Sequence, residues 1–203
     1  MSKTEAVMDS DFLQSILLDV DGSEELFKQI MDDLGIIPIV HPYVAEVELQ
    51  YCKKAQKLIN EGYIVRIKYD DFLHSEEERK VYNMQVWDIL DEFCEKDLPP
   101  EKYQDVFREG FRLTEHSIGE ILSELMAKEM RVPLFASNDK GAKSIAKRHF
   151  NSNRYQLEVK NLAELLREVI SRDTKIKWKE VKFLLKDERW RKDRENLREL
   201  WQK

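Results

Sequence analysis

Four acidic residues stand where the chain is expected to pass from an apolar strand into a helix. Asp9 ends a short apolar run, and Asp139 closely follows another at residues 132–136. Glu46 and Glu120 lie in the first turns of two expected helices. If the strands pair in one parallel sheet, these carboxylates converge at its C-terminal edge, where crowding requires a cation, a shared proton or costly repulsion. The pattern therefore predicts a metal site.

Each of these acids also has an explanation that involves no chemistry. Asp9 has the residue type and place of a helix N-cap. Ser117 and Glu120 have the Ser-x-x-Glu spacing of a capping box. Glu46 and Glu48 are two positions apart, so on a helix they point to different sides and only one can join a cluster. The four acids together therefore indicate a metal site more strongly than any one of them does alone. The second acid of the site is either Glu46 or Glu48.

Three neighbouring residues bear on the same site. Gly119 is unusual in the first turn of a helix and would let another group approach closely. Asp11 is placed to act as an outer acid beside Asp9, or to cap the following helix itself. Asp139 could likewise be a cap, but the end of a parallel strand is also where open α/β sheets bind ligands.

The elements that must position these acids alternate between strands and helices of ten or more residues. That alternation predicts a parallel sheet with βαβ crossovers. The expected strands cover residues 5–8, 36–40, 63–69, 132–136 and 155–159. The expected helices cover residues 11–18, 23–34, 42–59, 74–95, 101–111, 141–149 and 161–170, with another from 117 onward and one or two in the tail from 176 to 202.

Local signals refine this outline. Gly35 is placed to end the helix over 23–34, and Pro38 suggests that its strand is an edge strand or begins there. The helix over 74–95 is predicted to present an apolar face that includes Val81, Met84 and Leu90.

Composition favours a globular protein with one large domain or a domain and an appendage. The chain has 203 residues, of which 42% are apolar and 36% charged, and no apolar run approaches the roughly 18 residues of a membrane span. The lack of such a run predicts no membrane association. The two cysteines, Cys52 and Cys94, lack metal-ligand spacing and are read as reduced thiols, which predicts a cytoplasmic location. Residues 172–203 carry a net charge of +5 and the remainder −11, so an acidic body precedes a basic tail.

The order and spacing of the acidic segments resemble the PIN domain family of metal-dependent nucleases. The resemblance covers roughly residues 5–165. The stretches that carry it are Val7–Leu13, Tyr43–Glu46, Gly119–Lys128 and Val132–Asp139, with Ala142 and Ala146 after them.

The resemblance implies a Rossmann-like three-layer α/β/α fold with a central, mostly parallel sheet and a C-terminal helical extension. By resemblance, Asp9, Glu46, Glu120 and Asp139 are the acidic ligands of Mg²⁺ or Mn²⁺, and Ser137 is the small hydroxyl residue that orients one of them. The implied activity is that of an endoribonuclease that cleaves RNA by metal-activated water. Such a protein is the toxin of a toxin–antitoxin pair, or a related defence or mobile-element nuclease, with an inhibitory protein as a partner.

The expected domains follow from where the resemblance ends. Residues 1–171 form the PIN-like domain, with a helical insert at about 70–115, and residues 172–203 form a basic helical extension. Positive charge for an RNA backbone would come from Lys140, Lys143, Lys147 and Arg148, which equally suit an exposed helix face. The tryptophans of the tail favour packing on the domain, or on a second copy in a homodimer, over contact with nucleic acid.

Two other functions compete with the nuclease. One is a catalytically inactive PIN-like module whose acids are caps and whose insert or tail binds a protein. The other is a phosphatase of the haloacid dehalogenase type, because Asp19 and Asp21 in Asp-Val-Asp-Gly resemble its first motif. That motif needs a preceding strand and a later paired-acid motif, and helical spacing at residues 13–20 argues against the strand.

Overall fold

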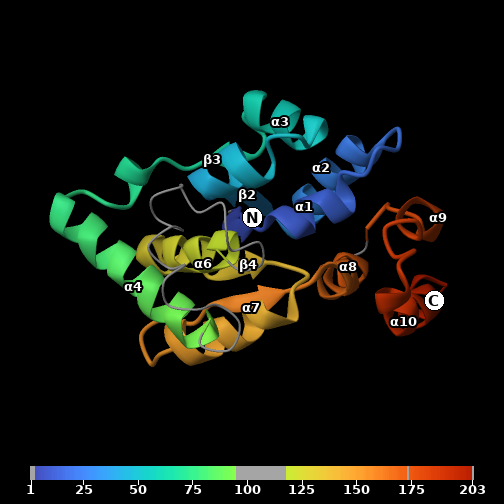
Figure 1. Cartoon of the computed structure of the whole chain (residues 1–203). Helices are drawn as coiled ribbons and strands as arrows, with labels where there is room; N and C mark the ends of the chain where they lie inside the picture. Colours follow the sequence, from blue (N-terminus) through green and yellow to red (C-terminus); the bar gives the residue numbers. More distant parts are fainter. Residues whose placement is uncertain (1–2, 95–117, 173, 203) are drawn as a thin grey trace.

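The computed structural model describes residues 3–94, 118–172 and 174–202, and within these it contains a five-stranded, entirely parallel sheet. The strands stand in the order β3-β2-β1-β4-β5 (Figure 1). Their bounds are β1 Thr4–Met8, β2 Ile36–Val40, β3 Val65–Arg66, β4 Leu134–Ala136 and β5 Glu158–Lys160. The predicted α/β class with a parallel sheet is therefore confirmed.

The strand order creates one topological switch point. The chain builds β1, β2 and β3 outward on one side, and then returns to place β4 and β5 on the other side of β1. In open parallel sheets of this kind the connections leave a crevice outside the C-terminal ends of the two strands at the switch. The corresponding region of this protein lies beyond Met8 of β1 and Ala136 of β4, which are partners in the ladder, and it is called the switch-point crevice below.

Helices cover both faces of the sheet because the strand side chains alternate between two buried cores. Ala6, Met8 and Val40 face one core, whereas Val7 and Phe135 face the other. The first core is covered by α1 Ser10–Ile16, α2 Ser23–Leu34, η1 Val44–Glu48, α3 Lys53–Asn60, α8 Leu162–Ser171, α9 Trp178–Val181, η5 Glu188–Trp190 and α10 Arg191–Trp201. The second is covered by α4 Glu76–Cys94, α6 Ile118–Met130, α7 Lys140–Ile145 and η4 Ala146–Phe150. A search of the described residues finds no helix that could span a membrane.

The helix α2 and the strand after it show which local signals hold. α2 has the predicted bounds, and Gly35 ends it in the left-handed conformation with φ of 63°. The prediction for Pro38 is wrong, since it is the third residue of β2, which lies between β1 and β3. Gly35 faces β1, whose Thr4 N–H donates to its carbonyl at 2.8 Å. Alternation turns Pro38 toward the β3 side, where pairing begins only at Ile39, so its missing N–H costs no ladder bond.

Three predicted elements are broken in the structure. The helix expected over 42–59 divides into η1, a wide turn with i→i+5 bonds, and α3. The strand expected over 63–69 pairs only at Val65–Arg66 and is followed by the short 3₁₀ helix η2 Tyr69–Asp71. The helix expected over 141–149 likewise divides into α7 and η4. The helix expected over 101–111 lies outside the described residues.

The long helix α4 packs on α6 through a face that only partly matches the predicted one, because Leu90 is buried as predicted and two other predicted members are not. Val81 and Met84 are exposed, and Tyr82 and Val86 are buried in their place. The Tyr82 hydroxyl donates to the Leu122 carbonyl at 2.8 Å and lies 3.3 Å from Nε2 of the buried His41. These polar contacts reach from α4 to α6 and to the end of β2, which favours the face that carries Tyr82.

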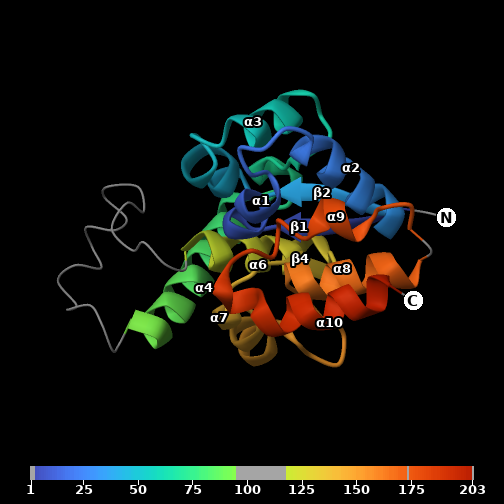
Figure 2. The same ribbon diagram turned by 90° about the vertical axis from the view of Figure 1, so that its right-hand side faces the viewer.

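The tail packs on the body, as its tryptophans predict. Figure 2 shows α10 running alongside α8, and the two helices are in contact. Leu197 and Trp190 are buried in the same core as α2 and α8. The Trp201 indole stacks obliquely on Trp178, 5.8 Å between ring centroids, and donates to the Ile176 carbonyl at 2.9 Å.

Leu197 therefore tests whether the tail belongs to the core. We expect Leu197→Ala to lower the free energy of unfolding by about 2–4 kcal/mol, because it leaves a cavity beside α8. Leu200→Ala, on the same helix but 40% exposed, should cost less than about 1 kcal/mol. Urea denaturation of the two variants checks this, and equal losses would contradict the packing described.

Candidate metal centre

The acids that follow β1 and β4 meet in the switch-point crevice. Asp9 comes directly after β1, and its backbone N–H donates to the Ala136 carbonyl at the end of β4 at 2.9 Å. Ser137 comes directly after β4, with Asp139 two residues further on. The convergence predicted for the ends of these strands is thus present, and it follows from the pairing of β1 with β4.

The hydroxyl of Ser137 joins three of the residues at this edge. Its Oγ lies 2.9 Å from Asp9 Oδ2 and 3.4 Å from Glu120 Oε1, and it accepts the backbone N–H of Asp139 at 3.1 Å. Ser137 is buried, and so are Asp9 and Glu120. The residue expected to orient one of the acids therefore contacts two of them.

A serine hydroxyl has one proton to donate and two lone pairs that accept. It cannot donate to the Asp9 and Glu120 carboxylates at once, and the shorter distance assigns its proton to Asp9. If Glu120 is protonated, it donates to Ser137 Oγ and all three hydrogen bonds are satisfied. The geometry thus favours one added proton on this pair in the absence of a cation.

Asp9 and Asp139 also cap short helices. Asp9 accepts the Ser10 N–H at 2.8 Å at the start of α1, and Asp139 accepts the Gly141 N–H at 2.7 Å at the start of α7. Each carboxylate has a second oxygen, so capping and membership of the cluster are compatible. The Ser117–Glu120 capping box remains a prediction, because Ser117 lies outside the described residues.

Asn138 fixes the loop that carries Ser137 and Asp139. Its backbone N–H donates to Asp11 at 3.3 Å, and its side chain donates to Ser15 of α1 at 3.0 Å and accepts the Leu162 N–H of α8 at 3.0 Å. The loop is therefore tied to the helices after β1 and β5, and Asp11 is held at the rim of the cluster.

The second acid of the cluster is Glu48 and not Glu46. A Cβ atom on residue 119 would stand 2.6 Å from the carboxyl carbon of Glu48, so only glycine at this position leaves room for that carboxylate. The Ser10 hydroxyl also hydrogen bonds Glu48. The close approach expected at Gly119 is therefore present, and the group that makes it is Glu48.

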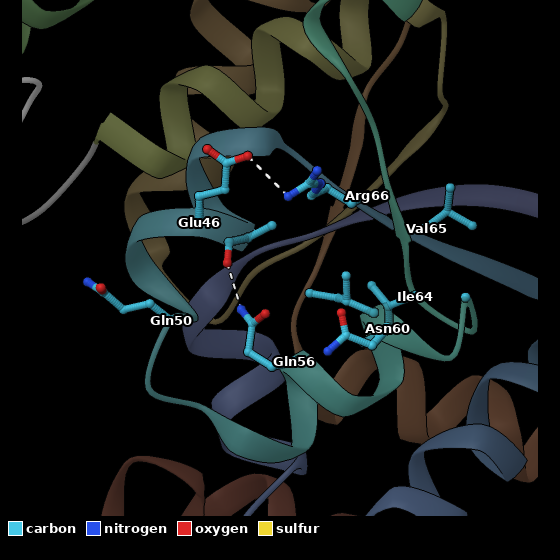
Figure 3. Close-up of a pocket in the computed structure, with 10 residues that line it drawn as sticks. Glu46, Gln50, Gln56, Asn60, Ile64, Val65 and Arg66 are labelled. Carbon is cyan, nitrogen blue, oxygen red and sulfur yellow. Dashed lines mark hydrogen bonds and ion pairs between the residues drawn. The ribbon is translucent and has the colours of Figure 1, made fainter.

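The prediction that Glu46 joins the cluster is wrong. Its carboxylate is 60% exposed and pairs with Arg66 at 3.1 Å. Figure 3 shows this pair beside Gln50, Gln56 and Asn60, which line the same pocket. The pocket has a volume of about 700 Å³. The wide turn of η1 directs residues 46 and 48 to different sides.

Burial and mutual repulsion raise the pKa values of three of the clustered acids, Asp9, Glu48 and Glu120. Burial, followed by the charges of Asp139 and Asp11, raises the pKa of Glu120 to about 8. Burial first, and then the charges of Asp11 and Glu120, raises the pKa of Asp9 well above its ordinary value. Burial and the charge of Asp11 also raise the pKa of Glu48, against a lowering by its bond from Ser10.

The structure adds one acid that sequence reasoning missed. Glu124 is fully buried on α6, one helical turn beyond Glu120, and neither of its carboxyl oxygens has a hydrogen-bond partner in the described part of the chain. Burial, and then the charges of Glu120 and Asp9, raises its pKa to about 10. The sequence feature that could have indicated Glu124 is its spacing: it lies four residues after Glu120, on the same helix face, within a largely apolar segment.

The basic residues assigned to RNA are on the surface of α7 and η4. Lys140, Lys143, Lys147 and Arg148 are exposed. Lys143 is engaged by Glu164 at 2.6 Å, so its charge is partly balanced within the chain. Whether these residues bind RNA stays a prediction.

The phosphatase motif lacks its structural context. Its apolar residues belong to α1, which runs through Ile16, and to the turn after it, rather than to a strand. Asp19 and Asp21 are in an exposed turn between α1 and α2 and do not follow a strand. The argument against this alternative from helical spacing is therefore confirmed.

The donor chemistry of the crevice fits a hard divalent cation. Carboxylate oxygens are ligands that Mg²⁺ and Mn²⁺ prefer. The Glu48 carboxylate fills the room left by Gly119, and Glu124 has two carboxyl oxygens without a partner in the described residues. Across residues 3–94, 118–172 and 174–202, no three Asp, Glu, His or Cys side chains already converge as ligands. Without a cation, carboxylates that repel one another are stabilised by turning toward hydrogen-bond donors. Asp9 and Asp139 do so, since they accept the backbone N–H groups of Ser10 and Gly141.

Comparison with known proteins gives no match: no family model, no curated protein and no solved structure is significantly similar to this chain.

The raised pKa of Glu120 predicts a pH-dependent stability. Folded Glu120 holds its proton up to about pH 8, whereas its ordinary pKa is 4.5. The folded state therefore binds more protons between these values, and the free energy of unfolding falls as the pH rises through this window. In Glu120→Gln the fall should be smaller by roughly 4–5 kcal/mol, because the two pKa values differ by about 3.5 and each pKa unit corresponds to about 1.4 kcal/mol. Urea denaturation in chelator across this range checks the difference, and parallel curves for the two proteins would contradict it.

Gly119 provides a second test of the site. Gly119→Ala would push the Glu48 carboxylate aside, and a flexible side-chain end can move at little cost. We expect the free energy of unfolding to change by less than about 1 kcal/mol. The Mn²⁺ affinity should fall at least about tenfold, which is typical when residues that position metal ligands are changed. Calorimetric titration measures the affinity, and an unchanged value would show that Glu48 does not serve the site.

Proposed function

We propose that this protein is a cytosolic, metal-dependent endoribonuclease of the PIN-like kind. The observation that carries the proposal is the pairing of Asp9 and Glu120 through Ser137 in the crevice between β1 and β4. Burying acidic groups lowers the stability of the fold unless they are paired with a partner such as a cation. These acids lie at the topological switch point, where open α/β sheets bind ligands. The resemblance of the acidic segments to PIN domains supplies the reaction class.

The residues that would hold the cation are Asp9, Glu48, Glu120 and Asp139. A bound Mg²⁺ or Mn²⁺ would supply an activated water and neutralise charge on the scissile phosphate. Ser137 holds Asp9 in place, and Asn138 ties the loop of Asp139 to α1 and α8. The chain's own contribution is thus a fixed, partly buried set of oxygen ligands.

The proposed substrate is RNA, bound as a polyanion near the cation. Lys140 and Lys147 lie exposed on the helical segment that follows Asp139, where their charge can meet phosphates next to the cleaved one. An inhibitory protein that covers this edge of the sheet is the partner expected of a toxin-like nuclease. A catalytically inactive interaction module is the outcome that the following experiment separates from the enzyme.

The two glutamates of η1 give a matched pair for testing the activity. Glu48→Gln should lower Mn²⁺-dependent RNA cleavage at least about 100-fold, on the scale of removing a group that stabilises charge in a transition state. Glu46→Gln changes the same group two residues away and should leave cleavage within about threefold, because its carboxylate pairs with Arg66 outside the cluster. Initial rates on a labelled single-stranded RNA measure both.

Asp9→Asn and Asp139→Asn complete the design. Asparagine also caps helices, so these variants should fold while losing cleavage, which circular dichroism and the same assay would show. If the wild type binds Mn²⁺ but cleaves no RNA, the inactive module is the better description. If it neither binds Mn²⁺ nor cleaves, the metal site itself is refuted.

A further inference from the structure

Glu124 is the least explained side chain in the described part of the protein. It has no exposed surface, and its Oε1 and Oε2 have no hydrogen-bond partner there. Buried polar groups are nearly always paired, because an unpaired one loses its hydration without compensation. Ser123 beside it is also buried, but Leu122, Leu125 and Met126 are buried apolar residues, so an apolar side chain would suit the position better for stability alone.

The position of Glu124 connects it to the acids of the crevice. It lies four residues after Glu120, and residues at this spacing share one face of a helix. The charges of Glu120 and Asp9 both act on its carboxyl group. α6 contacts β1 and β4, the two strands at the switch point. Glu124 therefore lies deeper in the same helix–sheet interface from which Glu120 reaches the crevice.

We propose that Glu124 is a further acid of the cation site and supplies a carboxylate to the bound ion from its buried side. This inference rests on the proposed metal-dependent function. A cation in the crevice would supply the missing partner for the unpaired oxygens of Glu124 and would offset the repulsion from Glu120 and Asp9. The buried acid then costs stability in the cation-free protein and adds affinity for the ion, a trade common at functional sites.

The test compares Glu124→Gln with a matched control on the same helix. Glu129→Gln makes the same chemical change on α6, but Glu129 is exposed and pairs with Lys128 at 3.6 Å. The full-length proteins are titrated with Mn²⁺, the free ion being followed by electron paramagnetic resonance. We expect Glu124→Gln to weaken Mn²⁺ binding at least about tenfold and Glu129→Gln to change it less than about twofold.

Thermal unfolding in chelator supplies a second readout. The cation-free Glu124→Gln protein should unfold about 2–6 °C above the wild type at neutral pH, because Glu124 must take up a proton when it is buried and glutamine has no such cost. Lower affinity together with higher thermal stability supports the inference, since a residue needed only for packing would not give this combination.

The remaining outcomes separate failure of the inference from failure of the proposed function. If Glu120→Gln loses Mn²⁺ binding while Glu124→Gln binds like the wild type, the metal site stands and the role of Glu124 is overturned. If Glu124→Gln fails to fold, Glu124 is a structural residue and the inference is also overturned. If the wild type binds no Mn²⁺, the proposed function fails, and the inference fails with it.

Discussion

The candidate site depends on a shortage of hydrogen-bond donors: the buried acids Asp9 and Glu120 share one serine hydroxyl, that of Ser137. Ser137 can donate to only one of the two carboxyl groups beside it, and Asp139 occupies one of its lone pairs through a backbone N–H. Glu120 must therefore hold a proton of its own or find a cation. Glu48 and Glu124 add to the same repulsion. Burial and this repulsion raise the pKa of Glu120 to about 8, so its proton offsets part of the repulsion at neutral pH, and a divalent cation would take the place of that proton.

The parallel sheet is what creates this constraint. Pairing of β1 with β4 places Asp9 next to the loop of Ser137 and Asp139, and α6 crosses the same strands with Glu120 and Glu124. The loop is held by Asn138 rather than left free. The tail, packed on α8, covers the opposite core and lies on the other face of the sheet from α6. Buried polar groups are therefore gathered at the C-terminal ends of β1 and β4, and both faces of the sheet are covered by apolar packing.

The sequence was sufficient where one physical rule decides the outcome. Asp9, Ser137 and Asp139 could be placed together because ends of parallel strands must meet, and α2 could be delimited because Gly35 ends it. The choice between Glu46 and Glu48 needed the wide turn of η1, which no residue pattern announces. The face of α4 was mistaken because Val81 and Met84 satisfy helical spacing as well as Tyr82 and Val86 do, and only the partner α6 decides. Glu124 was not predicted because it is a single acid within an apolar segment, and the sequence pattern does not show whether such an acid faces solvent or the core.

The central claim is that the acids of the crevice form a divalent cation site. The most direct measurement is a crystal structure of the protein soaked in Mn²⁺, with anomalous diffraction to locate the ion. The account predicts an anomalous peak between the carboxylates of Asp9, Glu48, Glu120 and Asp139, with Ser137 still bonded to Asp9. No peak in the crevice at a Mn²⁺ concentration that labels other surface carboxylates, with Ser137 still between Asp9 and Glu120, would contradict it.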